Sequence, residues 1–424
     1  MLIYALFFLM GAELFLVSPL LGVIAADLHV SDATAAWTVS GYVLGYAISS
    51  PVLAAITDRA HRRTVILVGT AIFAVGDLAC AVAPSSIFLA FTHALSGIGG
   101  GLAAPAAWAY LGETAAEPQR GRAIAAGAAV YAAGQIVGVP LGSILADGAG
   151  WRAAFLVIAA ALCLVAILIA LRLREPEDWG RARYAPKEAL RRSLRLWTRP
   201  LFAATLAATA LTQAARIGTY SYLGVLFTHR YGFTLIDLGS LGSAVGAGSL
   251  CGSLAAGFLV DAAHRRGYSV LFLLAGWGAV LAAAIPVALV APDLLLSLTA
   301  VLIWCAAGAA CYSTTQAFLS QNFGRKRAAA ISWNNSAMNA GIALGTALLG
   351  TIPLASGEFP IAATALALAG IGAALTARSQ ERRASARGLP AKRNETEGSP
   401  APQGPESRRA ESDQVDVCSR NPKH

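Results

Sequence analysis

The sequence predicts an all-α integral membrane protein in which twelve transmembrane helices form two pseudo-symmetric six-helix bundles. Hydrophobic residues fill 56% of the 424 positions and charged residues only 13%, whereas a soluble domain carries about 25% charged residues. Apolar runs of about 20 residues recur from end to end, and a helix of that length crosses the roughly 30 Å hydrocarbon core. A charged motif also returns at a fixed spacing, which indicates an internal duplication.

Short polar loops separate the apolar runs and define the expected helices. We place them at residues 2–24, 36–57, 64–83, 86–111, 121–146, 152–172, 200–227, 235–260, 268–290, 294–320, 327–350 and 359–377. The first run exceeds the roughly 7–15-residue apolar core of a signal peptide and has no basic segment before it, so we interpret it as the first membrane helix.

The distribution of basic residues predicts the orientation of these helices. Loops after even-numbered helices carry Arg59, Arg62, Arg63, Arg120, Arg122, Arg265, Arg266, Arg325, Lys326 and Arg327. Loops after odd-numbered helices are short and poor in Lys and Arg. Because basic loops stay in the cytoplasm, we expect both termini to be cytoplasmic and the protein to lie in the plasma membrane, which is the inner membrane of a bacterium.

A long basic loop in the middle of the chain marks the expected domain boundary. We predict an N-terminal six-helix bundle at 1–172, a cytoplasmic basic linker at 173–199 and a C-terminal six-helix bundle at 200–378. A polar, charged tail at 379–424 has the composition of a disordered segment. It is either a regulatory or lipid-touching arm or a solvated extension.

The repeated motif reads "TDRAHRRTV" at 57–65 and "VDAAHRRGY" at 260–268, which places Asp58 and Asp261 203 residues apart (261 − 58). The same shift aligns "GVPLG" at 138–142 with "GIALG" at 341–345. One shift that holds in separate regions predicts a duplicated six-helix unit. Two parallel halves related by an axis along the membrane normal are a transporter architecture.

The repeated motif has two interpretations, a conformational switch and a plain positive-inside anchor. Asp58 ends its helix, where the helix dipole disfavours a carboxylate, so it needs a partner. A contact that forms in one global state and breaks in another biases the two states. The expected switch residues are Asp58, Arg59, Arg62, Arg63, Asp261, Arg265 and Arg266.

The segment "GYVLGYAISSPVLAAITDRAHRRTVI" resembles the signature Gly-x3-Asp-Arg-x-Gly-Arg-Arg of the major facilitator superfamily, with Ala54 and His61 in place of the glycines. "AYLGETAAEPQRGRAIAAGAAVYAAGQIVGVPLGSILADGAGWRAAFLV" resembles proton-driven drug and sugar efflux members, and "GAELFLVSPLLGVIAADLHVS" resembles the arabinose-efflux-permease-like group. The resemblance covers about residues 5–375 and implies proton-coupled efflux. The family usually has an arginine, linked to proton coupling, where this sequence has His93.

Four ionisable residues inside apolar runs are candidates for proton coupling: Glu13, Asp77, His93 and Arg216. Such residues are costly in a bilayer and should face the bundle interior with partners. Glu13 and Arg216 also differ by 203 (216 − 13), so we expect them to face each other across a central cavity, as an ion pair or as two ends of a substrate site. Each alternatively satisfies a local polar neighbour.

Asp77 and His93 fall at similar depth in consecutive helices, which permits a proton relay between them. Histidine suits this role because it titrates near neutral pH. The alternative is that Asp77 is only a polar neighbour of an outer vestibule.

The fifth expected helix contains "GQIVGVPLG", in which Gly134, Gly138 and Gly142 share one face and allow close helix contact. Pro140 in the same stretch lacks a backbone donor and can kink the helix. The resemblance implies an efflux-type motif, and generic close packing is the compatible alternative. Polar candidates for lining the substrate cavity are Gln135, Gln213, Asn335 and Asn339, with interhelical hydrogen bonding as the alternative role.

These features favour a secondary active transporter that exports a small organic molecule, such as a drug, sugar or metabolite, in exchange for protons. A facilitator or importer with the same fold is the runner-up. A membrane-embedded enzyme is disfavoured because the six histidines are dispersed and no Gly-x-Ser-x-Gly or Walker-type loop occurs. We expect no cofactor and no metal, a monomer, and no nucleic-acid partner, because the basic residues lie in short loops and the tail.

Overall fold

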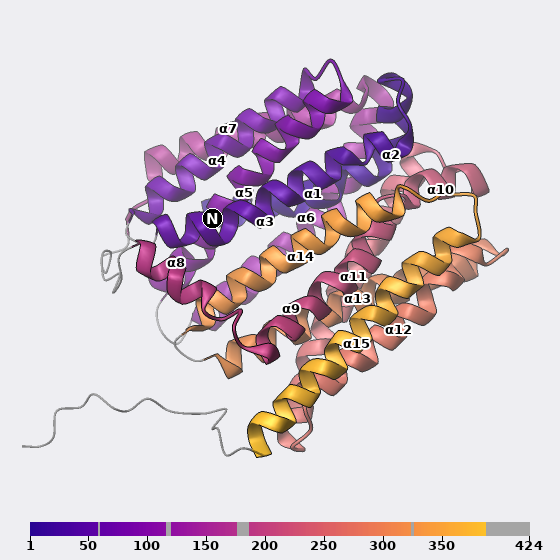
Figure 1. Cartoon of the computed structure of the whole chain (residues 1–424). Helices are drawn as coiled ribbons and strands as arrows, with labels where there is room; N and C mark the ends of the chain where they lie inside the picture. Colours follow the sequence, from indigo (N-terminus) through magenta and orange to yellow (C-terminus); the bar gives the residue numbers. More distant parts are fainter. Residues whose placement is uncertain (58–59, 116–119, 176–185, 324–325, 387–424) are drawn as a thin grey trace, which may run out of the picture.

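The computed structural model describes residues 1–57, 60–115, 120–175, 186–323 and 326–386, and every regular element within them is a helix (Figure 1). The first half of the chain forms α1 (Leu2–Asp27), α2 (Asp32–Ala35), α3 (Trp37–Ile56), α4 (Arg62–Ala81), α5 (Ser86–Thr114), α6 (Arg120–Ala149) and α7 (Trp151–Arg172). The short helix α8 (Pro186–Leu194) follows. The second half forms α9 (Pro200–Gln213), the π-helix η3 (Ala214–Gly218), α10 (Leu223–Tyr231), α11 (Leu235–Arg265), α12 (Val270–Val290), α13 (Leu294–Asn322), α14 (Arg327–Leu349) and α15 (Glu358–Ala386).

Nine of the helices in the described part of the chain are long and apolar enough to cross a membrane. The helices α3 and α14 and the broken segment from α9 to α10 run beside them (Figure 1). This arrangement confirms the predicted all-α membrane fold. The N-terminus and α8 lie at one end of the bundle, and α2 and α10 lie at the other (Figure 1).

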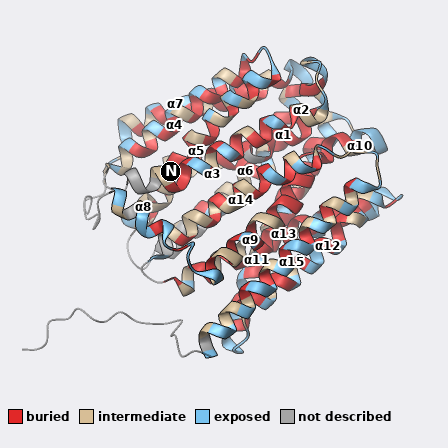
Figure 2. Ribbon diagram, viewed as in Figure 1, coloured by how far each residue is buried: buried red, intermediate tan, exposed pale blue. Residues whose placement is uncertain are grey.

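Burial separates an interior from an apolar outer surface, as expected for helices that face lipid. Buried residues line the inner faces of the helices and exposed residues cover their outer faces (Figure 2). Large apolar side chains are among the most exposed, including Phe91 at 75%, Leu171 at 74% and Phe258 at 75%. In water such a surface would aggregate, whereas acyl chains solvate it.

The two halves meet mainly along two pairs of helices. Helix α3 contacts α14, and α6 contacts α11. At the second contact, the Ser243 hydroxyl donates to the Ile136 carbonyl oxygen at 2.5 Å. A Cβ on Gly242 would lie 2.4 Å from a methyl group of Val139, so the backbones approach closely because α11 has glycine there.

The seventh span differs from the expected continuous helix at 200–227. It breaks after Gln213 into a π-helix, and a turn precedes α10. The irregular turn leaves the Arg216 carbonyl oxygen to accept from Trp304 Nε1 at 3.2 Å, and Arg216 lies within the break. The last helix also runs on to Ala386, beyond the point at which we placed the start of the tail.

Candidate functional site

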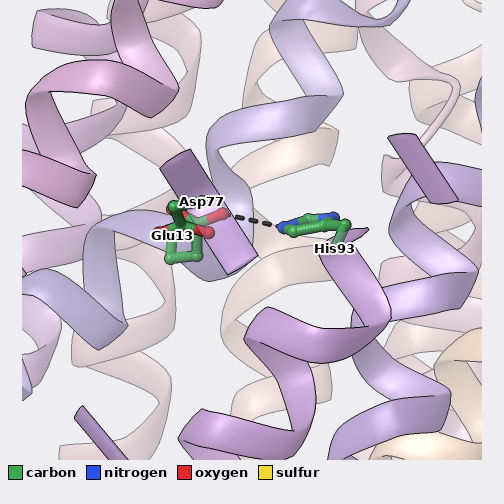
Figure 3. A group of neighbouring side chains, drawn as sticks. All are labelled: Glu13, Asp77 and His93. Atoms are coloured by element: carbon green, nitrogen blue, oxygen red, sulfur yellow. Dashed lines mark hydrogen bonds and ion pairs between the residues drawn. The ribbon is translucent and has the colours of Figure 1, made fainter. Parts of the chain in front are cut away.

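Three helices of the first half bring together Glu13 from α1, Asp77 from α4 and His93 from α5 (Figure 3). The residues are 1%, 0% and 2% exposed, respectively. One carboxylate or imidazole atom of each lies within 4.8 Å of the other two. The structure therefore unites three of the four residues predicted to couple protons, although two of them were expected as a separate pair.

The hydrogen bonds of His93 fix where its protons sit. Its Nδ1 lies 2.9 Å from the Thr38 carbonyl oxygen, and its Nε2 lies 2.8 Å from Glu13 Oε1. A carbonyl oxygen only accepts, so Nδ1 carries a hydrogen and donates it. The short contact between Nε2 and Oε1 then holds one proton, either as imidazolium with carboxylate or as imidazole with carboxylic acid.

Each carboxyl group in the cluster has one satisfied and one unsatisfied oxygen. Asp77 Oδ1 accepts from the Ser96 hydroxyl at 2.6 Å. Glu13 Oε2 and Asp77 Oδ2 are buried and have no hydrogen-bond partner among the described residues. Buried polar oxygens without donors are costly, and a proton or cation bound there would lower that cost.

Small residues allow the helices around the cluster to approach closely. A Cβ on Gly97 of α5 would lie 2.0 Å from the Tyr42 carbonyl oxygen on α3. A Cβ on Gly76 of α4 would lie 2.4 Å from the Ser96 hydroxyl oxygen. The ring of Tyr42 lies 4.9 Å from the imidazole of His93, centroid to centroid, so the cluster is walled by aromatic carbon as well as by backbone.

Arg216 occupies the break in the seventh span and is 7% exposed. Its NH2 group donates to the Ser249 hydroxyl at 2.5 Å, and its NH1 group donates to Gln213 Oε1 at 3.3 Å. Gln213 Nε2 in turn donates to the Gly308 carbonyl oxygen at 2.9 Å. These contacts are all to neutral groups of the second half.

The predicted ion pair between Glu13 and Arg216 is wrong in this structure. Glu13 pairs instead with His93, which reaches it from the same half, and neutral partners hold Arg216 in the other half. The second interpretation, in which the two residues form two ends of a substrate site, stays a prediction.

The three glycines of α6 lie against α1. A Cβ on Gly134, Gly138 or Gly142 would come within 2.0, 2.2 and 2.1 Å, respectively, of atoms of Phe8, Ala12 and Leu16. The opposite side of α6 faces α11, where a Cβ on Gly239 would lie 2.9 Å from Pro140 Cα. Helix α6 therefore packs between α1 of its own half and α11 of the other half. Its Gly138 contacts Ala12, the residue that precedes Glu13.

The polar cavity candidates differ in their contacts. Asn335 Oδ1 accepts from the Tyr312 hydroxyl and from Gln316 Nε2, and its backbone carbonyl accepts from Asn339 Nδ2 at 2.9 Å. Gln135 is 8% exposed. The bonds of Asn335 to α13, like that of Gln213 to Gly308, match the interhelical alternative, whereas the bond of Asn339 lies within α14. A role in binding substrate stays a prediction for Gln135, Gln213, Asn335 and Asn339.

Part of the charged motif lies outside the described residues, namely Asp58 and Arg59. Arg62 pairs with Glu113 at 3.1 Å. The backbone N–H groups of Arg62 and Arg63 donate to the two carboxylate oxygens of Glu175, at 2.5 and 3.1 Å. In the second half, Asp261, Arg265 and Arg266 are exposed at the end of α11. Their role as a switch stays a prediction.

Sequence reasoning missed several partners of the site. Thr38 acts through its backbone carbonyl, which no residue pattern shows. Ser96 lies one helical turn after His93, and this spacing was a usable signal. Glu175 binds the first N–H groups of α4, a common place for a carboxylate, but it lies in a different loop.

Comparison with known proteins shows which family this chain resembles. The Major Facilitator Superfamily model matches residues 3–346 and also 208–410. The uncharacterized MFS-type transporter YceJ of Bacillus subtilis (strain 168) is 30% identical over 258 residues, which cover 60% of this chain and 64% of that protein. The multidrug resistance protein B homolog of Mycobacterium tuberculosis (strain CDC 1551 / Oshkosh) is 34% identical over 132 residues, 31% of this chain and 24% of that one. The matched part therefore spans less than two thirds of these relatives.

Solved structures share the fold at low sequence identity. A bacterial homolog of the human lysosomal transporter Spinster, inward-facing and occupied, superposes with a TM-score of 0.73 at 17% identity, covering 90% of this chain and 96% of that one. A D-xylose–proton symporter gives a TM-score of 0.72 at 16% identity, covering 89% and 95%. With the family model matched over most of its length, the chain belongs to the major facilitator superfamily.

Proposed function

We propose that this protein is a secondary active transporter that exports a small organic molecule in exchange for protons. Family membership supports transport by alternating access of two six-helix halves. The relative named as a multidrug resistance protein favours efflux of drug-like molecules. The observation that carries the proton coupling is the 2.8 Å contact between His93 Nε2 and Glu13 Oε1, which is buried inside the first half and can hold one proton.

The cluster offers a physical reason for exchange. With its proton, the Glu13–His93 pair is neutral overall and is compatible with burial. Without the proton, the site presents the carboxylates of Glu13 and Asp77 together in a low-dielectric interior, which is costly. The cost of burying two carboxylates falls when the site opens to water or when a cationic group of the substrate binds there. Proton and substrate therefore occupy the site in turn.

The remaining features of the proposal follow the predicted topology. The protein works as a monomer in the bacterial inner membrane with both termini in the cytoplasm, and its partners are protons, the substrate and lipid. The two bundles, 1–172 and 200–378, rock about the contacts of α3 with α14 and of α6 with α11. The charged motifs after α3 and α11 bias the two states.

An efflux panel tests the proposal. Drugs, sugars, nucleosides and amino-acid metabolites are loaded into a susceptible host that expresses either the wild-type chain or the Glu13→Gln variant. At least one compound is expected to leave wild-type cells faster, and an uncoupler should abolish the difference. Glu13→Gln, expressed at the same level, should remove the uncoupler-sensitive part. Efflux that the uncoupler does not change would instead support a facilitator.

A further inference from the structure

The cluster of Glu13, Asp77 and His93 has the donor set of a metal site. Imidazole nitrogen together with carboxylate oxygen suits zinc and neighbouring divalent transition metals. The hydrogen bond from Nδ1 to the Thr38 carbonyl leaves Nε2 as the free donor atom of a neutral His93, and Nε2 is the atom that faces Glu13. Metal-binding histidines are commonly held through their other ring nitrogen in this way.

The unsatisfied oxygens are a second, independent sign of a cation site. Glu13 Oε2 and Asp77 Oδ2 are buried without a hydrogen-bond partner among the described residues, although the other oxygen of each group is bonded. The three donor atoms lie within 4.8 Å of one another. Ligand atoms about 2.0–2.2 Å from one ion lie roughly 3.3 Å apart in a tetrahedral site, so small side-chain rotations close the cluster around an ion.

We propose that Glu13, Asp77 and His93 bind a divalent transition-metal ion of the zinc class in place of the shared proton. The ion bonds to Nε2 and to one oxygen of each carboxylate, and the proton held between Nε2 and Oε1 leaves to solvent together with any proton carried by Asp77. Two carboxylates, a neutral imidazole and a dication sum to zero charge, which suits a buried site. Ser96 then holds Asp77 as Thr38 holds His93.

Metal binding at this position has a functional consequence that rests on the proposed function. An ion that occupies the proton site blocks proton exchange, so zinc-class ions inhibit coupled efflux. No metal site was expected from the sequence, because its histidines and cysteines lack the spacing of a metal motif. The donors come from three helices and converge only in the fold.

The test uses the full-length chain, purified in detergent without a histidine tag, and Co²⁺ as a spectroscopic probe. The wild type is expected to bind one Co²⁺ per chain with visible ligand-field absorption, and a pH indicator in weak buffer should report released protons. His93→Gln and Asp77→Asn should each weaken binding by at least about tenfold. The control is His229→Gln, an exposed histidine on α10, which should leave binding unchanged.

The outcomes separate this inference from the proposed transport mechanism, because binding is measured without substrate or gradient. Equal Co²⁺ affinity in wild type and both cluster variants overturns the metal site, as does loss of binding in His229→Gln alone. Thermal unfolding and monodispersity of each variant show that it is folded. A chain that binds Co²⁺ through the cluster but shows no uncoupler-sensitive efflux overturns proton coupling only.

Discussion

Glu13 and Arg216 occupy equivalent positions of the two halves, 203 residues apart (216 − 13), yet their surroundings differ. Glu13 lies in a continuous helix and meets two other ionisable side chains. Arg216 lies in a π-helical break and meets hydroxyl, amide and indole groups that carry no charge. We propose that the position in the first half serves as an exchangeable cation site, whereas its counterpart in the second half holds a fixed positive charge.

On this proposal the two halves have distinct tasks. An imidazole is the side chain best suited to gain and lose a proton near neutral pH, whereas a guanidinium stays protonated. A π-helical turn is often found at functional sites because it places backbone groups outside the regular ladder. We therefore expect changes in the first half to alter pH dependence and changes around Arg216 to alter substrate handling.

The largest effect is expected from His93→Leu. The substitution leaves Glu13 without the partner that lies 2.8 Å away, and breaking a buried pair in this manner costs about 3–5 kcal/mol. Uncoupler-sensitive efflux should fall to the background of the empty host, and any remaining flux should be independent of pH. His229→Gln is the matched histidine control. Retention of a normal pH profile in His93→Leu would show that the first half does not take part in proton coupling.

Gly308→Ala should have the next largest effect, through Arg216. A Cβ at this position would lie 2.2 Å from Arg216 Cδ, so the guanidinium must move. We expect the apparent affinity for substrate to fall roughly tenfold, or about 1.4 kcal/mol, while the pH dependence is retained.

Initial efflux rates at several substrate concentrations and pH values check this second prediction. Gly276→Ala is the control, because a Cβ there meets no atom within 4 Å. A changed pH profile with unchanged affinity would reverse the division of tasks between the halves.

Gly138→Val tests the packing of the first half, because it displaces α1 without changing any charge. A Cβ on Gly138 would lie 2.2 Å from Ala12 Cβ, next to Glu13. Overpacking of this kind costs about 1–3 kcal/mol, so the midpoint of thermal unfolding in detergent should fall. Gly148→Val on the same helix should not lower it, because a Cβ there meets open space. Equal midpoints for the two variants would show that the glycine face is not needed for packing.

Ser18→Ala should have the smallest effect. The Ser18 hydroxyl donates to the Tyr220 carbonyl oxygen at 2.7 Å and joins α1 to the second half. Its loss should cost about 1 kcal/mol and shift the balance of global states about fivefold, measured from distances between spin labels on the two halves. Ser221→Ala, which removes a bond within one half, should leave the distance distribution unchanged.

The sequence predicted the fold because hydrophobicity and length alone decide which segments cross a membrane, and the repeat fixed the two-bundle architecture. It also placed Glu13, Asp77 and His93 among the candidates, because ionisable residues are rare in apolar runs. The contacts among them were harder to predict. The pairing of Glu13 with His93 instead of Arg216 depends on helix rotation and on close approach at Gly97.

The break in the seventh span shows a second limit of prediction from the sequence. "LTQAARIGTYSYLG" contains no proline, and its one glycine close to Arg216, Gly218, is common in membrane helices and does not by itself predict a break. The π-helix is stabilised by a tertiary contact, the donation from Trp304 Nε1 to the Arg216 carbonyl oxygen. Local sequence carries no signal for a partner 88 residues away.

Proton movement in proteoliposomes tests most directly the claim that the first half holds the exchanged proton. The purified protein is reconstituted around a trapped pH-sensitive dye, and a compound identified by the efflux panel is added outside. The wild type should change the internal pH as the compound enters, whereas Glu13→Gln should move the compound down its gradient without a pH change. A pH change of equal size in Glu13→Gln would contradict the assignment of the coupling proton to Glu13 and His93.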